Sequence, residues 1–166
     1  MLARFRVNGE TIVEDVGSNE TLLDLLRNKL RLTGVKKGCD EGACGACTVL
    51  LNGKPVSSCL LLAVQVSDAE ITTVEGLSKG GELSEIQGAF LEKYGFQCGF
   101  CTPAVILVAK ALLDENPNPT IEDIKDAFEG ILCRCTGYEQ IIESVLRAAE
   151  IRMRDSGIQY VRLEDR

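Results

Sequence analysis

The chain has 166 residues, of which 45% are hydrophobic and 26% charged, an ordinary globular composition that excludes a wholly disordered chain. Its formal net charge of −7 excludes nucleic acid and anionic membrane surfaces as the main partners, because both bind basic patches. The absence of histidine removes Ser-His and Cys-His catalysis, Rieske ligation and any zinc site that uses imidazole.

The first half of the chain predicts two β-hairpins, because Asn-Gly, the preferred two-residue hairpin turn, twice separates short runs with strand character. The strands are predicted over 4–7 and 11–16, around Asn8-Gly9, and over 48–51 and 54–58, around Asn52-Gly53. A helix is predicted over 21–32, where leucines form an apolar face and Thr21 with Asp24 matches a capping box, and a fifth short strand over 70–74. This pattern predicts an α+β sheet that clasps one helix.

The second half predicts four helices with short connections, which indicate a small bundle. They are expected from Leu83 to near Gly95, from the N-cap Thr102 through Leu113, over 121–128 behind a Thr120/Asp123 capping box, and from Tyr138 to about Met153 behind a Thr136/Glu139 capping box. The glycine-rich segment 77–81 reads as a linker, so we expect one domain over residues 1–76 and a second over 82–160.

No secretory or membrane-spanning segment is expected. Residues 1–6 contain no long apolar stretch, and the longest apolar runs, such as 104–109, are far shorter than a membrane span. We therefore expect a cytoplasmic protein. In that reducing setting clustered cysteines are more often metal ligands or redox groups than disulfides.

The first four cysteines, Cys39, Cys44, Cys47 and Cys59, are candidate ligands of a [2Fe–2S] cluster. The spacing C-x4-C-x2-C with a distal fourth cysteine is that of plant-type ferredoxins. Glycines between them, including Gly42 and Gly45, allow backbone N–H groups to approach the sulfurs. Buried free thiols and a structural zinc site are the alternatives; zinc prefers paired C-x2–4-C knuckles.

The second four cysteines, Cys98, Cys101, Cys133 and Cys135, have a less specific spacing, which a four-cysteine zinc site would also fit. Both pairs precede expected helix N-termini, where free N–H groups and the helix dipole favour negative charge. Gln97 is either an exposed turn residue or a polar group placed beside a neighbouring cofactor.

Three segments in order are recognisable: GCDEGACGACTV at 38–49, QCGFCTP at 97–103 and LCRCTGY at 132–138. Over residues 3–153 the chain resembles the small iron–sulfur subunit of the xanthine dehydrogenase/aldehyde oxidase family of molybdenum hydroxylases. It departs from the family pattern at Ala104 and Ile131, where Gly and Asn are usual, and neither change removes a cysteine.

The resemblance implies a ferredoxin-like β-grasp domain with one [2Fe–2S] cluster, followed by a four-helix domain with another. It implies a large subunit that binds molybdopterin dinucleotide, near Gln97 and Cys135, and a medium subunit that binds FAD, near the loop of Gly42 and Gly45. Electrons would pass from molybdenum through the second and then the first cluster to FAD. The expected complex is a dimer of heterotrimers.

By the same resemblance, the complex oxidises a small aldehyde, a purine or another N-heteroaromatic, with no catalytic residue on this chain. The alternatives are a free-standing two-cluster ferredoxin, a zinc-stabilised interaction module, and a subunit of a related enzyme that acts on carbon monoxide or an aromatic CoA thioester.

Overall fold

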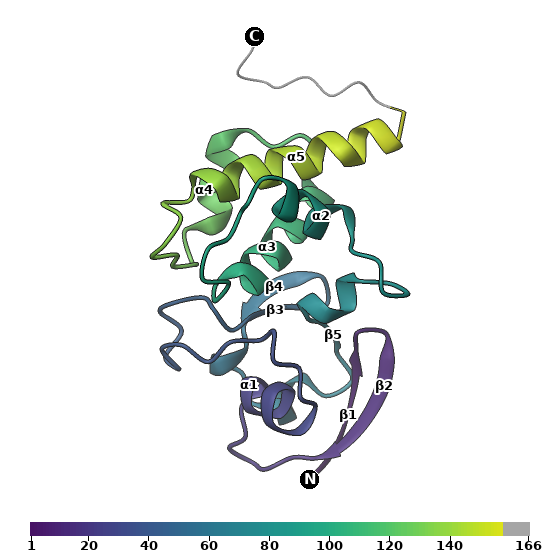
Figure 1. Cartoon of the computed structure of the whole chain (residues 1–166). Helices are drawn as coiled ribbons and strands as arrows, with labels where there is room; N and C mark the ends of the chain where they lie inside the picture. Colours follow the sequence, from purple (N-terminus) through teal and green to yellow (C-terminus); the bar gives the residue numbers. More distant parts are fainter. Residues whose placement is uncertain (158–166) are drawn as a thin grey trace.

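The computed structural model describes residues 1–157, so the last residues of the predicted second domain, 158–160, lie outside the described part. The chain forms a mixed sheet with a short helix beneath it and a group of helices above it (Figure 1). The strands are β1 (Leu2–Val7), β2 (Glu10–Asp15), β3 (Thr48–Leu51), β4 (Lys54–Ser57) and β5 (Glu70–Thr72). Short 3-10 helices follow at Ser58–Leu60, Ala63–Val66 and Val74–Leu77.

The sheet has the order β2-β1-β5-β3-β4, in which β1 and β5 are parallel and the other pairs antiparallel. Both predicted hairpins are present, since β1 pairs with β2 and β3 with β4. Each turn has positive φ at both central residues, 51° and 87° at Asn8 and Gly9 and 50° and 81° at Asn52 and Gly53. This is the type I′ geometry that Asn-Gly favours.

The helix predicted over 21–32 begins where expected but changes form. Thr21 caps α1 (Leu22–Asp24) by accepting the Asp24 N–H at 3.1 Å, and the chain then continues as a π-helix, Leu25–Lys29. The wider π turn is closed by an i to i+5 bond from the Leu30 N–H to the Leu25 carbonyl, at 3.1 Å. The prediction of one regular α-helix was therefore wrong beyond its first turn.

The sheet is covered on both faces. Val49 belongs to the core with the fully buried leucines of α1 and the π-helix, whereas its neighbour Leu50 packs with Leu107 and Ala111 of α3. Adjacent residues of a strand point to opposite faces, so β3 joins the two cores. The separation between the sheet and the helices is thus fixed by direct packing.

The four predicted helices are α2 (Glu85–Glu92), α3 (Thr102–Glu115), α4 (Ile121–Phe128) and α5 (Glu139–Asp155). The capping box at Thr120 and Asp123 is confirmed, but two other caps differ. Cys101, not Thr102, is the N-cap of α3, and Tyr138 in the left-handed region, not Thr136, is the N-cap of α5.

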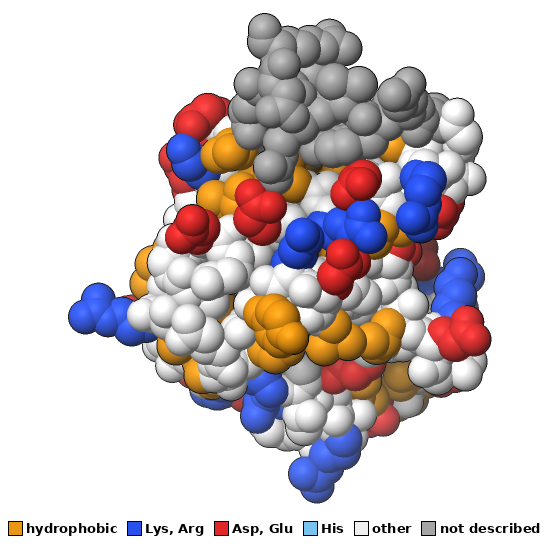
Figure 2. Space-filling view, turned by 45° about the horizontal axis from the view of Figure 1, so that its top comes forward, with side chains coloured by type: hydrophobic (Ala, Val, Ile, Leu, Met, Phe, Trp, Pro, Cys, Tyr) orange, Lys and Arg blue, Asp and Glu red, His pale blue; other side chains and the backbone are white. Residues whose placement is uncertain are grey.

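Ion pairs link the helices on their outer side. Arg152 of α5 donates to Glu85 of α2 at 2.6 Å and to Asp114 of α3 at 2.9 Å. Figure 2 shows acidic and basic side chains interspersed on this end of the molecule, with hydrophobic side chains between them. Among residues 1–157, no helix is both long and apolar enough to cross a bilayer.

Candidate metal centres

The first cysteine group lies on two segments that the β3–β4 hairpin brings together. Cys39 and Cys44 are on the loop before β3, Cys47 directly precedes β3, and Cys59 lies in the 3-10 turn after β4. The Cys47 carbonyl accepts hydrogen bonds from the Ser58 N–H (3.4 Å) and hydroxyl (2.7 Å). The Asn-Gly turn therefore returns Cys59 to the beginning of β3, beside Cys47.

Backbone N–H groups of the loop point at the sulfur of Cys39. Its Sγ accepts from the amides of Ala43 (3.2 Å), Cys44 (3.3 Å) and Glu41 (3.5 Å). The Glu41 amide has the largest effect, and with the other donors it lowers the pKa of the Cys39 thiol to about 7 although desolvation opposes it. The loop thus favours the thiolate, the form that binds metals.

Two glycines let the backbone approach this closely. A Cβ on Gly38 would lie 2.7 Å from Cys44 Sγ, and a Cβ on Gly42 would lie 2.6 Å from Leu60 Cδ1. Gly42 also has a φ of +80°, which side chains disfavour. At Gly38 the space beside Cys44 Sγ is therefore a backbone cradle that any larger residue would fill, whereas at Gly42 a larger residue would meet Leu60.

Cys47 and Cys59 form the buried side of this group, with 3% and 7% of their surfaces exposed. Burial first, and then the adjacent Cys47 thiol, raise the pKa of Cys59 to about 11. Two thiols in contact in apolar surroundings deprotonate together only when a cation compensates their charge. The pair suits a positively charged metal centre.

The second group gathers at the beginning of α3 and on the loop between α4 and α5. Cys101 caps α3 and contacts the Cys133 thiol, while Cys98 contacts Cys135. Cys101 is 7% exposed, whereas Cys98 and Cys135 are exposed. One pair of thiols therefore faces the interior and the other faces the surface.

The thiols of the second group differ in their surroundings. Burial, followed by the Cys133 thiol, raises the pKa of Cys101 to about 12, and the Cys98 thiol raises the pKa of Cys135. Burial acts in the same sense on Cys133, but hydrogen bonds from the Thr136 side chain and backbone outweigh it and lower the pKa of Cys133. Cys133 is thus the thiol of this group that its neighbours favour as an anion.

A buried hydroxyl beside Cys101 lacks a hydrogen-bond partner within the described part of the chain. The Oγ1 atom of Thr102, the first residue of α3, is buried and has no hydrogen-bond partner in the structure of residues 1–157. Native proteins rarely leave such an atom unsatisfied. An inorganic sulfide near Cys101 would supply the acceptor that it lacks.

The thiols are arranged in pairs. No three or more Cys, Asp or Glu side chains among residues 1–157 are grouped to hold a metal ion. The contacts instead join Cys39 with Cys44, Cys47 with Cys59, Cys98 with Cys135 and Cys101 with Cys133. Each group offers two pairs of thiols, which fits a [2Fe–2S] cluster held by four cysteines, with one pair for each iron.

The two groups are joined directly. The Leu132 N–H donates to the Cys44 carbonyl at 3.0 Å, so the residue before Cys133 is hydrogen-bonded to a cysteine of the first group. At the same contact a Cβ on Gly45 would lie 2.1 Å from the Gly130 carbonyl oxygen. Gly45, predicted to lie near a flavin, is buried against the second half of the chain.

Gln97, predicted to approach a pterin, is exposed beside the exposed Cys98. Tyr138 is a residue whose part in the site the sequence did not indicate: its hydroxyl accepts the Cys133 N–H at 2.8 Å and donates to the Ile131 carbonyl at 2.9 Å. Its position in LCRCTGY is the one signal that could have drawn attention to it.

Known proteins are similar to this chain in sequence and fold. The chain is 52% identical over 144 residues to the nicotinate dehydrogenase small FeS subunit of Eubacterium barkeri, covering 87% of this chain and 92% of that one. It is 51% identical over 142 residues to the nicotine 6-hydroxylase small subunit of Paenarthrobacter nicotinovorans, covering 86% of each chain. The chain belongs to the iron–sulfur subunits of the xanthine dehydrogenase/aldehyde oxidase family of molybdenum hydroxylases.

Family models agree with this membership. Residues 5–78 match the 2Fe-2S iron-sulfur cluster binding domain and residues 73–146 match the [2Fe-2S] binding domain. The fold is similar to that of quinoline 2-oxidoreductase from Pseudomonas putida 86, with a TM-score of 0.89 and 43% identity over 93% of this chain and 96% of that one. The predicted family, the α+β fold with its β-grasp domain, and the two [2Fe–2S] clusters as cofactors are confirmed. This iron–sulfur subunit belongs to a molybdenum-dependent oxidoreductase of more than one subunit.

Proposed function

We propose that this iron–sulfur subunit carries electrons from a molybdopterin centre on a large subunit to FAD on a medium subunit. The observation that carries the proposal is the hydrogen bond of the Leu132 N–H to the Cys44 carbonyl, which joins the two cysteine loops. Packing of β3 on α3 supports it, because a rigid contact holds two redox centres at a fixed separation. The clusters, when bound, supply one-electron oxidation and reduction.

We propose all eight cysteines as the cluster ligands, in the domains 1–76 and 82–160: Cys39, Cys44, Cys47 and Cys59 in the first, and Cys98, Cys101, Cys133 and Cys135 in the second. Three features support this assignment: the space that Gly38 leaves beside Cys44 Sγ, the buried Thr102 hydroxyl without a partner among the described residues, and the pairing of the thiols. The N–H groups that surround Cys39 and the hydroxyl at Cys133 stabilise thiolate charge and so tune the reduction potentials.

The exposed residues suggest which side meets each partner. Gln97 and Cys135 lie at the surface, where they could approach the pterin of the large subunit. Leu60, 62% exposed above Gly42, offers an apolar contact beside the first cysteine group, on the side proposed for the flavin subunit.

The relatives indicate the substrate class. The names of three similar proteins refer to nicotinate, nicotine and quinoline, which are N-heteroaromatic compounds. We therefore propose an N-heteroaromatic substrate for the complex of this chain, in preference to an aldehyde. A dimer of heterotrimers in the cytoplasm is the assembly and place that we propose.

Anaerobic purification of the tagged chain tests these proposals. About four irons and about four acid-labile sulfides per chain are expected, with two larger subunits in the same fraction by mass spectrometry. Cys44→Ser should remove one electron paramagnetic resonance signal and Cys101→Ser the other. Zinc in place of iron would refute the electron-transfer function, and a variant that kept both signals would refute the ligand assignment.

A further inference from the structure

The loop that carries Cys133 and Cys135 contains a hydroxyl aimed at sulfur. Thr136 Oγ1 accepts the N–H of Tyr138 at 3.1 Å and lies 3.2 Å from Cys133 Sγ. Because the Tyr138 amide already occupies the oxygen as an acceptor, the Thr136 proton is free to point at the sulfur. A ligand thiolate has no proton of its own, so Thr136 is the donor of this O–H···S bond.

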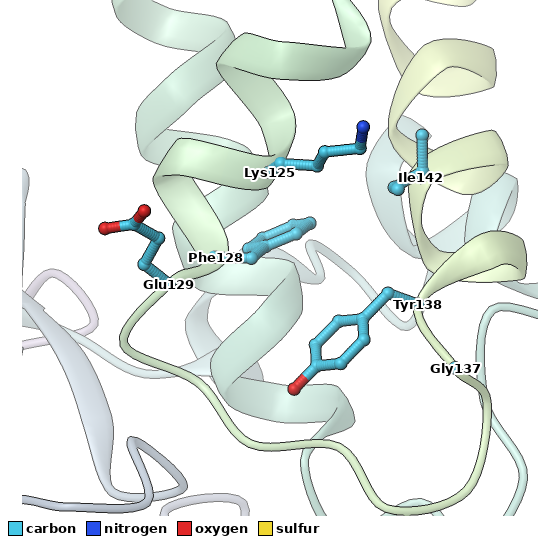
Figure 3. Close-up of a pocket in the computed structure, with 6 residues that line it drawn as sticks. All are labelled: Lys125, Phe128, Glu129, Gly137, Tyr138 and Ile142. Atoms are coloured by element: carbon cyan, nitrogen blue, oxygen red, sulfur yellow. The ribbon is translucent and has the colours of Figure 1, made fainter.

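Tyr138 holds the same loop from its other side. Its hydroxyl accepts a hydrogen bond from the Cys133 N–H and donates one to the Ile131 carbonyl. The Cys133 amide therefore donates to Tyr138 and not to a sulfur. Figure 3 shows the Tyr138 ring beside Phe128, with the hydroxyl directed away from Lys125 and Ile142. The ring forms one wall of a cavity of about 370 Å³ between α4 and α5.

This arrangement contrasts with the first cysteine group. There the donors to Cys39 are the backbone amides of Glu41, Ala43 and Cys44. Around Cys133 the backbone amides of Cys135 and Thr136 contribute as well, but Thr136 adds a side-chain hydroxyl, a donor that Cys39 lacks. A side chain can be exchanged without rebuilding the loop, which makes the contribution of this donor measurable.

We propose that Thr136 is a positioning residue that sets the reduction potential of the second cluster by its hydrogen bond to Cys133 Sγ, while Tyr138 fixes the loop by holding the Cys133 amide. The inference rests on the proposed ligand role of Cys133. A hydrogen bond to a ligand sulfur stabilises the more negative, reduced cluster more than the oxidised one, and so raises the potential.

The test compares Thr136→Val, which removes the hydroxyl at nearly constant shape, with Thr136→Ser, which keeps it. Both are made in the full chain, purified anaerobically with its accompanying subunits, and titrated with electron paramagnetic resonance detection. The second cluster of Thr136→Val should have a more negative midpoint potential than wild type, with the first cluster and the iron content unchanged. Thr136→Ser should match wild type, as should the distant control Thr11→Val on the exposed side of β2.

Unchanged potentials in Thr136→Val, with both signals present, would overturn the inference and leave the electron-transfer proposal intact. Loss of the second cluster from Thr136→Val but not from Thr136→Ser would support the need for the hydroxyl, whereas its loss from both would overturn the inference. A wild-type chain without the second signal would instead refute the proposed function.

Tyr138→Phe tests the second half of the inference, because phenylalanine keeps the ring in place and removes only the hydroxyl. The Cys133 amide should then exchange with deuterium about fivefold faster or more, by mass spectrometry of the segment 131–137. Exchange at the wild-type rate would show that Tyr138 does not hold the amide and would overturn its role.

Discussion

Gly45→Ala should separate the two cysteine loops. A Cβ at this position would lie 2.1 Å from the Gly130 carbonyl oxygen and 3.0 Å from the Gly130 carbonyl carbon and Ile131 Cα, all of which are backbone atoms. The chain can relieve this overlap only by moving one loop away from the other, which lengthens the hydrogen bond between Leu132 and Cys44.

The matched control is Gly53→Ala in the β3–β4 turn. Gly45 and Gly53 both have positive φ, +68° and +81°, but a Cβ on Gly53 meets nothing within 4 Å. Both variants carry the left-handed cost of alanine, about 1–2 kcal/mol, and the same change in the unfolded chain. The difference in stability between the two variants therefore isolates two costs of Gly45→Ala: overpacking against Gly130, of about 1–3 kcal/mol, and loss of the hydrogen bond between Leu132 and Cys44, worth about 1 kcal/mol.

Amide hydrogen exchange of the loaded protein measures this difference without unfolding it. A local cost of about 2–4 kcal/mol corresponds to exchange of the Leu132 amide about 30-fold to 1,000-fold faster in Gly45→Ala than in Gly53→Ala. Equal exchange at Leu132 in the two variants would refute the claim that the Gly45–Gly130 contact holds the loops together. Iron content, measured in parallel, shows whether the first cluster remains.

Three further outcomes are expected. Removing the N-cap of α4 by Thr120→Ala should lower the free energy of unfolding by about 1 kcal/mol, measured by urea denaturation, because the Asp123 N–H loses its acceptor at 3.1 Å; no loss of stability would contradict the capping role. Burial would raise the pKa of Glu85, but the hydrogen bond and charge of Arg152 hold this pKa below its ordinary value of 4.5. The ion pair therefore stabilises the fold at pH values above 4.5, and this stabilisation is lost as the pH falls through the folded-state pKa. Glu85→Gln should therefore lower stability at about pH 7 and change it little once the pH lies below the folded-state pKa of Glu85, and an equal loss under both conditions would contradict this assignment. Gln97→Ala should leave both clusters assembled and perturb the molybdenum spectrum of the complex; an unchanged spectrum would count against its place beside the pterin.

The sequence by itself determined the features that local residue patterns encode. Asn-Gly at two positions specified both hairpin turns, because this pair adopts positive φ more readily than others. The Thr120 capping box specified the start of α4, since the hydrogen bonds that form it lie within four residues. The cysteine motifs likewise indicated the family, because thiolate ligands of a cluster must stand at characteristic spacings.

Only the tertiary structure decided how these pieces meet. The contact of Gly45 with Gly130 and the bond from Leu132 to Cys44 join residues more than 80 positions apart, and no local pattern records such a distance. Thr136 shows the same limit, because its sequence context matched a helix cap while the fold gave its hydroxyl to the Cys133 sulfur. A polar side chain hydrogen-bonds to whichever partner the folded chain brings within reach. The role of Thr136 therefore depends on how the loop packs, which the local sequence does not specify.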